Sequence, residues 1–509
     1  MTIDQAMLDR LRALQRAARP LEPGRARRRD LRNAVVSSTE RFLRKIDGLR
    51  GYIETADKGS GLLASPISEN GVEIEDAIDL VEQNVVRPGG QPAAAAHLAY
   101  IPGGGLYHSA LGDFMAAVSN KYAGVFFAGP GAVRMENMLV RWVADLVGYP
   151  AGTAGSITSG GSLANLTAIA TARDAHGLRG ADYASATAYV TSQTHHSIHK
   201  ALRLAGMAEA PIREVPADDR YRMRPDALAA AIAADRGRGL RPWLVVATAG
   251  TTDVGAVDPL DRIGEVARRE GCWFHVDAAY GGFFLLTGHG RALMRGIETS
   301  DSVVLDPHKS LFLPYGIGVV LVRDADALAR THSYAGHYMQ DTLAQGSELS
   351  PAEVSPELTK HFRAMRMWLP LIVLGTNPFA AALEEKLLLA RYFHEKVQEL
   401  GFEAGPEPDL SVVTFRWAPR ELSLEQANAA NEAIGESVRR DGRIFISSTM
   451  VDGKFTLRLA VLVFRTHRKT IDLALTVLGE HAAAVASRLP YGALAGRAPD
   501  SHPEARSSD

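Results

Sequence analysis

The sequence predicts an α/β protein with a mostly parallel sheet in a large domain and a small α+β domain at its C-terminal end. One observation is the alternation of short β-rich runs with helical patterns from about residue 105 to 375, which is typical of a parallel sheet covered on both faces. The other is a change near residue 376, where a long helical pattern leads into strands separated by turn residues.

The predicted strands of the large domain are runs of apolar and β-branched residues: 189–192, 243–248, 273–276, 302–305 and 318–322. Helical patterns lie between most of them, at residues 163–176, 198–205, 225–235 and 259–270. Ligands of such sheets bind at the carboxyl ends of the strands. The residues that directly follow these runs are therefore the first candidates for a functional site.

The C-terminal part is predicted to contain a helix at 380–400, a strand at 411–416, a helix at 423–441 and two antiparallel strands, 444–447 and 455–464, around the turn Asp452-Gly453. We divide the chain into four parts: an N-terminal helical segment (1–104), the large domain (105–375), the small domain (376–489) and a tail (490–509) that we expect to be disordered.

The N-terminal segment begins with an amphipathic pattern at residues 3–18, where Ile3, Met7, Leu11 and Leu14 recur at helical spacing. Its apolar stripe needs a partner, for which a second subunit is the candidate. Further helices are expected at 32–50 and 72–87. The basic segment 25–32 is interpreted as a solvated linker or helix face rather than as a site for an anionic partner.

Composition narrows the class of protein. A hydrophobic content of 46% and a charged content of 22% are those of a globular protein, and a net charge of −2 gives no support for nucleic-acid binding. The sequence has no 18-residue apolar run, so we expect no membrane span. The single cysteine, Cys272, excludes an internal disulfide, fits the cytoplasm and is expected to be a buried, inert thiol. Frequent Ala, Arg and Gly suggest a bacterial source.

A lysine and an aspartate at the ends of two predicted strands indicate pyridoxal 5'-phosphate (PLP) chemistry. Lys309 follows the run 302–305, and Asp277 ends the run 273–276. A lysine amine can condense with the aldehyde of PLP, and a carboxylate can hold the proton of its pyridinium ring. A carboxylate at the end of an apolar run is costly to bury unpaired, and a pyridinium nitrogen is a suitable partner.

Three further segments fit the same interpretation, each with a plainer alternative. The turn 159–162 precedes a helical pattern and offers N–H groups to a phosphate, although such turns are also common caps. His195 follows the run 189–192 and could lie over the cofactor ring, but an ordinary surface or capping histidine is the preferred interpretation of a lone histidine. Thr252 could reach the cofactor or cap its turn. With one cysteine and no His-Glu-x-x-His pair, the sequence predicts no metal site.

These motifs make the chain resemble the group II PLP-dependent amino-acid decarboxylases, which include aromatic-L-amino-acid, glutamate and diaminobutyrate decarboxylases. The resemblance covers residues 90–470 approximately and rests on His-Val-Asp-Ala-Ala-Tyr-Gly-Gly (275–282), Asp-Pro-His-Lys-Ser (306–310), Ser-Gly-Gly-Ser-Leu-Ala-Asn-Leu (159–166) and Gly-Lys-Phe-Thr-Leu-Arg-Leu-Ala (453–460). It implies the PLP-dependent transferase fold type I, which is aspartate aminotransferase-like. It also implies a carboxy-lyase that acts through a Schiff base and a quinonoid intermediate.

The resemblance also implies roles for single residues. For the ring of the cofactor these are a Schiff base on Lys309, pairing of Asp277 with the pyridine nitrogen, and stacking by His195. The residues implied to hold the phosphate or line the cofactor are Gly161, Ser162, Thr252, Ala279 and His308. The family forms homodimers with the active site at the interface, and the implied substrate-pocket residues are Tyr100, Ile101, Pro102 and Phe126.

Two positions bear on the reaction. In aromatic decarboxylases a loop tyrosine 29 residues after the lysine returns a proton to the substrate carbon, and Tyr338 holds that position here. Relatives with phenylalanine there tend to form aldehydes, so Tyr338 favours simple decarboxylation, with Tyr334 as the alternative if the loop aligns differently. Asp306 departs from the asparagine of the aromatic enzymes, and its charge would repel a phosphate unless it points away or binds an N–H group.

The function predicted from the sequence is decarboxylation of an L-amino acid to an amine and CO2. An aromatic substrate is favoured because Tyr100 and Phe126, with glycines 103–105, suggest an apolar pocket, although these aromatics could instead pack at a dimer interface. The alternatives are an acidic or diamino-acid substrate, and a PLP-dependent aldehyde synthase, transaminase or lyase. A non-catalytic binding subunit is the alternative from another class of protein.

Overall fold

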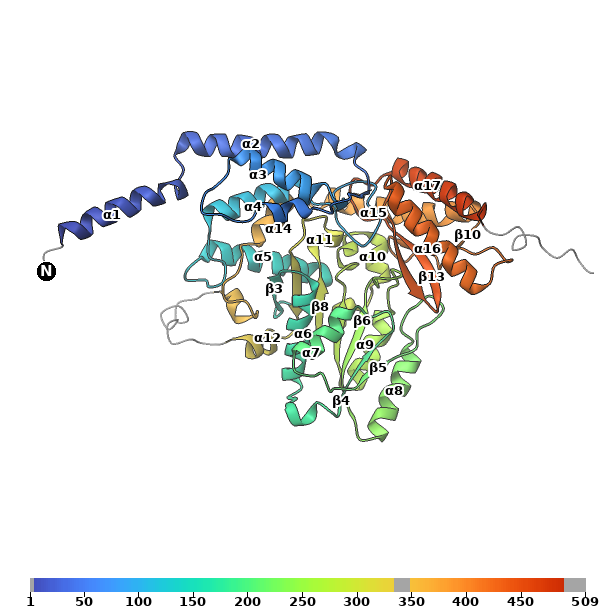
Figure 1. Ribbon diagram of the computed structural model, residues 1–509. Coiled ribbons are helices and arrows are strands. Elements are labelled where there is room, and N and C mark those ends of the chain that lie inside the picture. The colour runs from blue at the N-terminus through green and yellow to red at the C-terminus, as the bar shows by residue number, and fades with distance from the viewer. Residues whose placement is uncertain (1–3, 334–347, 489–509) are drawn as a thin grey trace, which may run out of the picture.

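The computed structural model describes residues 4–333 and 348–488, and within these ranges its largest sheet has seven strands (Figure 1). The strand order is β3 (Ala154–Thr158), β9 (Gly318–Val322), β8 (Ser302–Leu305), β7 (Trp273–Asp277), β6 (Arg241–Thr248), β4 (Ala186–Val190) and β5 (Ile212–Glu214). Strands β8, β7, β6, β4 and β5 run parallel, whereas β9 is antiparallel to both β8 and β3. The prediction of a mostly parallel sheet is confirmed.

Helices cover both faces of this sheet, as its alternating side chains require. Along β9, Val319 and Leu321 face one hydrophobic core, and Val320 and Val322 face another. The first core contains α5 (Pro130–Val147), α8 (Pro225–Gly237) and α9 (Leu260–Arg269). The second contains α6 (Gly161–Ala175), α7 (His196–Leu204) and α12 (Ala325–His332).

The short strand β5 was not predicted, and the differences at β4 and β3 have local reasons. Strand β4 ends at Val190, earlier than the predicted 189–192, because Thr191 already belongs to a turn in which its N–H group donates to Oγ1 of Thr194 at 3.0 Å. Strand β3 was not predicted. It consists of Ala-Gly-Ser-Ile-Thr, which has low β propensity, and pairing with β9 holds it at the sheet edge.

A second sheet is fully antiparallel and forms the core of the C-terminal part. Its order is β10 (Phe402–Ala404), β11 (Val412–Trp417), β13 (Lys454–Ala460) and β12 (Ser447–Val451), packed against α15 (Asn377–Glu399), α16 (Leu424–Asp441) and α17 (Arg468–Ala486). The predicted hairpin is confirmed, with positive φ at both Asp452 and Gly453, as tight hairpin turns require. The predicted strand 444–447 instead begins at Ser447, because Ile444 and Phe445 are buried against the chain near His97.

Four helices precede or flank the large sheet at the N-terminal side: α1 (Gln5–Ala18), α2 (Arg25–Lys45), α3 (Ile74–Val81) and α4 (Tyr107–Ser119). Helix α1 projects from the body, and α2 lies across α3 and α4 (Figure 1). The predicted helix 32–50 therefore starts earlier, and the basic segment 25–32 is the exposed first part of α2. In the predicted helix 72–87, the α-helical part is Ile74–Val81, and a π-helical turn, Glu82–Val86, follows it. The domain boundaries stay predictions, and residues 490–509 lie outside the described residues.

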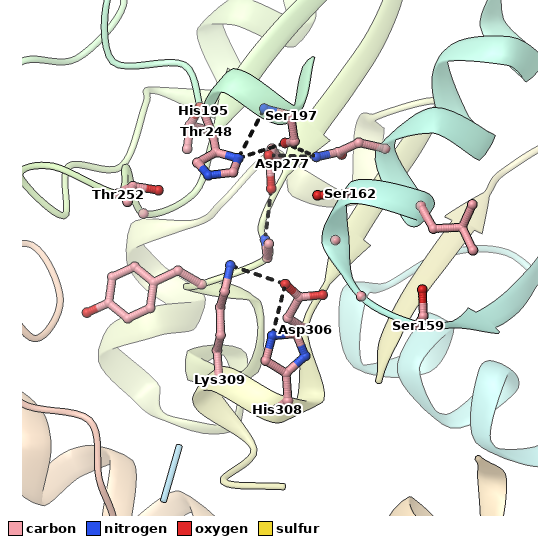
Figure 2. Close-up of a pocket in the computed structure, with 17 residues that line it drawn as sticks. Ser159, Ser162, His195, Ser197, Thr248, Thr252, Asp277, Asp306, His308 and Lys309 are labelled. Carbon is pink, nitrogen blue, oxygen red and sulfur yellow. Dashed lines mark hydrogen bonds and ion pairs between the residues drawn. The ribbon is translucent and has the colours of Figure 1, made fainter. Parts of the chain in front are cut away.

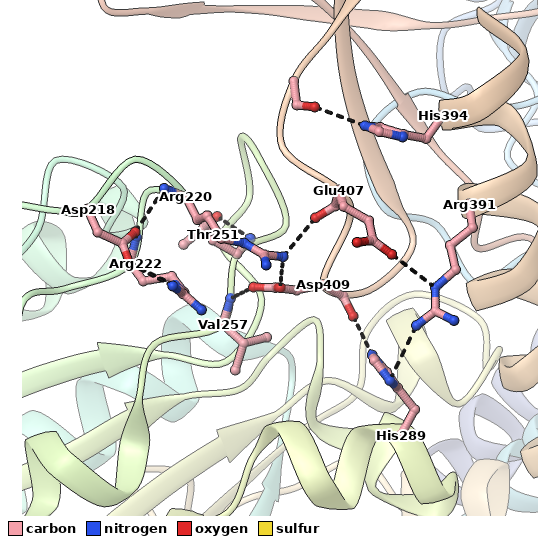
Figure 3. Close-up of polar contacts among 12 residues, drawn as sticks. Asp218, Arg220, Arg222, Thr251, Val257, His289, Arg391, His394, Glu407 and Asp409 are labelled. Carbon is pink, nitrogen blue, oxygen red and sulfur yellow. Dashed lines mark hydrogen bonds and ion pairs between the residues drawn. The ribbon is translucent and has the colours of Figure 1, made fainter.

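Asp409, between β10 and β11, joins the small sheet to loops of the large one (Figure 3). Its Oδ1 accepts from Nη2 of Arg220 at 2.7 Å, and its Oδ2 accepts from the N–H group of Val257 at 2.9 Å. Its carbonyl oxygen accepts from Nε2 of His289 at 2.9 Å. Because Val257 closes the loop that carries Thr252, these contacts set the position of that loop relative to the small sheet.

Two expectations from composition concern Cys272 and membrane spans. Cys272 is buried as predicted, and burial raises the pKa of its thiol to about 12. In the described ranges no single helix is long and apolar enough to cross a membrane. One pair of helices, α14 (Ala364–Leu374) and α15, meets that criterion only when taken together, and the two are bent by 94°.

A buried ion pair ties α5 and β3 to the segment before α14. Nζ of Lys360 lies 2.6 Å from Oε1 of Glu136 and 2.6 Å from Oγ of Ser156. The N–H group of Ile157 donates to the same carboxylate oxygen at 3.0 Å. Lys360 is 4% exposed and Glu136 is 2% exposed, so neither charge can turn to water if the other is removed.

We expect Lys360→Met to lower the free energy of unfolding by about 3–5 kcal/mol, because it leaves Glu136 buried without its cation. The matched control is Lys396→Met, which removes a lysine that is paired with Glu399 at the surface and should leave stability nearly unchanged. Urea unfolding followed by circular dichroism measures both. Equal effects of the two variants would contradict the importance of burial for this pair.

Candidate active site

The carboxyl ends of β4, β6, β7 and β8 open on one cavity of about 290 Å³ (Figure 2). All eight residues predicted to contact a cofactor line it: Gly161, Ser162, His195, Thr252, Asp277, Ala279, His308 and Lys309. The remaining lining residues are Ser159, Gly160, Leu163, Asn165, Ser197, Thr248, Gly250, Tyr280 and Asp306. The structure thus brings together residues that the sequence places more than a hundred positions apart.

Lys309 enters the cavity from α11 (Pro307–Ser310), a single helical turn after β8. Proline at the first position of this turn has a backbone angle suited to a helix start. The turn packs closely on Gly103, where a Cβ atom would lie 2.5 Å from the carbonyl oxygen of Lys309. Nζ of Lys309 lies 3.1 Å from Oδ2 of Asp306, which is buried beside it. The lysine amine is therefore held at the cavity wall by a neighbouring carboxylate.

Asp277 is the last residue of β7 and is 5% exposed. Its Oδ2 accepts from Nδ2 of Asn165 at 3.0 Å, and its Oδ1 accepts from the N–H group of Ala279 at 3.1 Å. Both donors are neutral. Within the described ranges, no lysine, arginine or histidine forms an ion pair with this carboxylate, although an isolated buried charge is costly. Asp277 therefore lines the cavity as an acceptor that still lacks a cation.

His195 follows β4 and begins α7 as its N-terminal cap. Its Nδ1 accepts from the N–H group of Ser197 at 3.3 Å and lies 2.8 Å from the Oγ atom of the same serine. Burial lowers the pKa of His195 from its ordinary value, and the charge of Asp277 partly opposes this shift. The ring is consequently a neutral imidazole near pH 7, held at one edge by Ser197.

The start of α6 forms the opposite wall of the cavity. The N–H groups of the first turn of a helix have no partner within the helix and attract anions, and Ser162 adds a hydroxyl group there. A Cβ atom at Gly161 would lie 2.8 Å from Oδ2 of Asp306, so a side chain would fill this space. Nδ1 of His308 donates to the carbonyl oxygen of Ile317 at 2.5 Å, which fixes its ring beside the same wall.

These groups fit three parts of PLP: its phosphate, its aldehyde and its pyridinium nitrogen. The first turn of α6 suits a phosphate, Nζ of Lys309 suits an aldehyde, and the cation that Asp277 lacks is what a pyridinium nitrogen supplies. Asp306, which replaces the asparagine of the aromatic enzymes, also lines the cavity: its Oδ2 pairs with Lys309, and its Oδ1 has no hydrogen-bond partner among the described residues.

The predicted substrate residues are not part of this cavity in a single chain. Ile101 and Pro102 are buried near the Lys309 turn, Tyr100 is 62% exposed with φ of 55°, and Phe126 is half-buried elsewhere. Their role in a pocket completed by a second subunit stays a prediction. Tyr338 lies outside the described residues.

Sequence reasoning missed the polar residues behind Asp277, above all Asn165 and Ser197. A signal for Asn165 was present: a polar amide in the apolar pattern of α6, one helical turn after Ser162. Residues three apart share a helix face, so the amide was placed to face the same site as the phosphate turn. Nothing in the sequence linked it to Asp277, 112 positions away.

Comparisons with known proteins also indicate a PLP-dependent decarboxylase. Residues 67–418 match the family described as the pyridoxal-dependent decarboxylase conserved domain. An aromatic-L-amino-acid decarboxylase of Bacillus atrophaeus is 33% identical over 410 residues, covering 79% of this chain and 84% of that protein. An L-2,4-diaminobutyrate decarboxylase of Rhizobium meliloti (strain 1021) is 31% identical over 445 residues, covering 86% of each.

Among solved structures, that of Oryza sativa TDC with PLP and tryptamine superposes with a TM-score of 0.85 at 24% identity, covering 91% of this chain and 99% of that one. This likeness, with the mixed seven-stranded sheet and the smaller antiparallel sheet, confirms the predicted fold class. The family match over most of the chain and the two decarboxylase relatives add the chemistry. The chain belongs to the pyridoxal-dependent decarboxylase family and is a carboxy-lyase with PLP as its cofactor.

Proposed function

We propose that this enzyme converts an aromatic L-amino acid to its amine and CO2, with Lys309 and Asp277 as the central catalytic residues. The observation that carries the proposal is the meeting of a lysine amine, an acceptor that lacks a cation and a helix N-terminus around one cavity. The bacterial relative named for aromatic substrates supports the substrate class. An acidic or diamino-acid substrate is the alternative, supported by the diaminobutyrate relative.

In this proposal Lys309 would hold PLP at its aldehyde carbon, and its amine would displace the product amine from that carbon. Its Nζ must lose a proton before it can act as a nucleophile. Oδ2 of Asp306, 3.1 Å away, is the nearest carboxylate to accept that proton. Oδ2 of Asp306 lies both beside Lys309 and against Gly161 at the start of α6. Its pairing with the lysine offsets its charge, which reduces its repulsion of a phosphate held there.

Asp277 holds a proton on the pyridine nitrogen by supplying the opposite charge. PLP bound there supplies an electron sink for the pair left when the bond between Cα and the carboxylate breaks. The two neutral donors to Asp277 keep its carboxylate in place without neutralising it. A fixed charge in a buried site stabilises developing charge more strongly than water does.

His195 is proposed to act at the face of the cofactor ring, and Tyr338 at the Cα atom of the substrate. His195 would stack on the ring, and its neutral imidazole suits that position because it does not repel the pyridinium. Tyr338 would return a proton to Cα after CO2 has left. This completes the balance: one proton is gained at Cα for the carboxylate that is lost as CO2.

The wild-type enzyme loaded with PLP should release CO2 and amine in equal amounts from Trp, Tyr, Phe or Dopa, and much less from Glu or diaminobutyrate. Lys309→Ala should lower this rate by at least about 10³-fold, because the group that binds the aldehyde is gone. Product analysis and CO2 release measure both. Borohydride reduction followed by mass spectrometry should label Lys309 only in the wild type.

The control is Lys200→Ala, which removes an exposed lysine from α7 and should leave the rate unchanged. Activity of Lys309→Ala at the wild-type rate would refute the assignment of the lysine. Release only from Glu or diaminobutyrate would keep the reaction and replace the proposed substrate class.

Tyr338→Phe should lower amine formation by about 10²–10⁴-fold, the usual contribution of a positioned acid. If the intermediate then reacts with O2, aldehyde, ammonia and hydrogen peroxide should appear in place of amine. Tyr334→Phe is the matched control, four residues earlier in the same segment. A loss of amine in Tyr334→Phe with normal Tyr338→Phe would transfer the role to Tyr334.

We also propose that the enzyme is a homodimer whose second copy covers the N-terminal helices. Helix α1 has no buried residue, and even its apolar side chains Met7, Leu11 and Leu14 are each about half exposed. Helices α2 and α4 line an apolar groove of about 1500 Å³ in which Phe114 and Val118 are 59% and 71% exposed. Exposed apolar surface of this extent is typical of an interaction site.

Light scattering should therefore give twice the mass of one chain. Phe114→Asp should shift the protein towards the monomer, because it places a charge in the groove that the second copy would cover. Leu424→Asp is the control, since Leu424 is similarly exposed, at 52%, but starts α16 in the small domain. A wild-type monomer, or a dimer unaffected by Phe114→Asp, would contradict this interface.

A further inference from the structure

Buried polar residues, of which the proposed chemistry uses only the bond from Asn165 to Asp277, form a hydrogen-bonded chain behind this carboxylate. Nδ2 of Asn165 donates to Oδ2 of Asp277 and to Oγ of Ser197, at 3.0 Å in each case. On its other side, Oδ1 of Asn165 lies 3.0 Å from Nε2 of His275, whose Nδ1 lies 2.8 Å from Oγ of Ser302. Asn165, Ser197, His275 and Ser302 are each 3% exposed or less. The chain thus connects α6, α7, β7 and β8 without solvent.

The end of the chain at His195 fixes the orientation of the amide. The N–H group of Ser197 donates to Nδ1 of His195, so this nitrogen carries a lone pair. The hydroxyl group of Ser197, 2.8 Å from the same nitrogen, also donates to it and accepts from Asn165. The neutral imidazole then carries its proton on Nε2. The amino group of Asn165 must face Ser197 and Asp277.

With the amide in this orientation, the hydrogen bonds at the Ser302 end of the chain are also satisfied. Burial lowers the pKa of His275 to about 4, so its ring is neutral and carries one proton. Because Oδ1 of Asn165 only accepts, that proton lies on Nε2, and Nδ1 accepts from the hydroxyl group of Ser302. Ser302 in turn accepts from the indole of Trp273 at 2.8 Å. Every donor along the chain therefore points towards Asp277 and His195.

The opposite orientation would leave a buried donor without an acceptor. With the amide turned over, His275 would accept at Nε2 and donate from Nδ1 to Ser302. Two donors would then approach Ser302, and among the described residues its own hydroxyl hydrogen would have no acceptor. An unsatisfied buried donor is costly, so Ser302 favours the orientation that presents donors to the site.

We propose that Asn165 is a positioning residue, oriented by His275 and Ser302, which holds the Asp277 carboxylate and the Nε2-protonated form of His195 in place together. This inference rests on the proposed roles of Asp277 and His195 at the cofactor. It assigns a function to Ser302, a residue that does not line the cavity. One amide group would couple the two side chains that lie on the ring nitrogen and on the ring face.

The test compares two variants with matched controls in the PLP-loaded full-length enzyme. Asn165→Leu removes the amide at similar volume, and its control Thr167→Val removes a buried hydroxyl that bonds only within α6. Ser302→Ala removes the distant hydroxyl. Its control Ser300→Ala removes an equally buried one that bonds to Tyr149 and to the carbonyl of Ile297.

Three quantities are measured for each variant: the dissociation constant of PLP, the pH midpoint of the absorbance of the bound cofactor, and the thermal unfolding midpoint. We expect Asn165→Leu to weaken PLP binding by about 10- to 100-fold. We expect Ser302→Ala to weaken it by about 2- to 10-fold, the equivalent of one buried hydrogen bond. Both should shift the absorbance midpoint, because the proton positions at Asp277 and His195 are no longer fixed. Thr167→Val and Ser300→Ala should match the wild type in both cofactor readouts, and Ser302→Thr, which keeps the hydroxyl, should restore the wild-type midpoint.

If Ser302→Ala lowers only the unfolding midpoint, as Ser300→Ala can, its role is structural and the inference is wrong. If Asn165→Leu does not fold, the comparison of Ser302→Ala with Ser300→Ala decides the matter alone. Failure of the wild type to bind PLP or to release CO2 from any amino acid would instead contradict the proposed function. The two failures are therefore distinguishable.

Discussion

The burial of Asp277 at the end of a central strand is the constraint on which the rest of the site depends. A carboxylate that is 5% exposed must be compensated, and among the described residues only neutral groups donate to it. Those donors come from Ala279, two residues later, and from Asn165 on α6. The helix that offers its N-terminus to an anion is thereby held against the strand that requires a cation.

The sheet explains why separate segments converge on that carboxylate. Parallel strands end at one edge, so the residues after β4, β6, β7 and β8 surround a single cavity. The antiparallel β9 returns the chain between β8 and β3, which places α6 beside the lysine turn. The small sheet then secures the loops: Asp409 binds the loop of Thr252, and Oη of Tyr280 bonds to Ser411 at 2.7 Å.

The cavity has two polar systems with different tasks. On one side Asp306 pairs with Lys309, so a carboxylate lies beside the amine at the place where the covalent bond is proposed to form. On the other side the chain from Trp273 to Asn165 keeps every donor pointing at Asp277 and His195. Because the two polar systems are separate, Lys309 can gain or lose a proton while Asp277 and His195 keep their positions. A network of this kind is valuable only when all its members are satisfied.

The sequence by itself determined the fold class and the cluster of Asp277, Lys309 and His195, because strongly apolar runs mark strands and reactive side chains follow their ends. It also determined the family, because short motifs typical of the group II decarboxylases occur at residues 275–282 and 306–310. Only the tertiary structure decided which neutral groups surround these residues, since the bonds among Asn165, Ser197, His275 and Ser302 join four elements that no local pattern connects. The edge strand β3 likewise escaped prediction, because its small residues form a strand only when β9 supplies the hydrogen bonds.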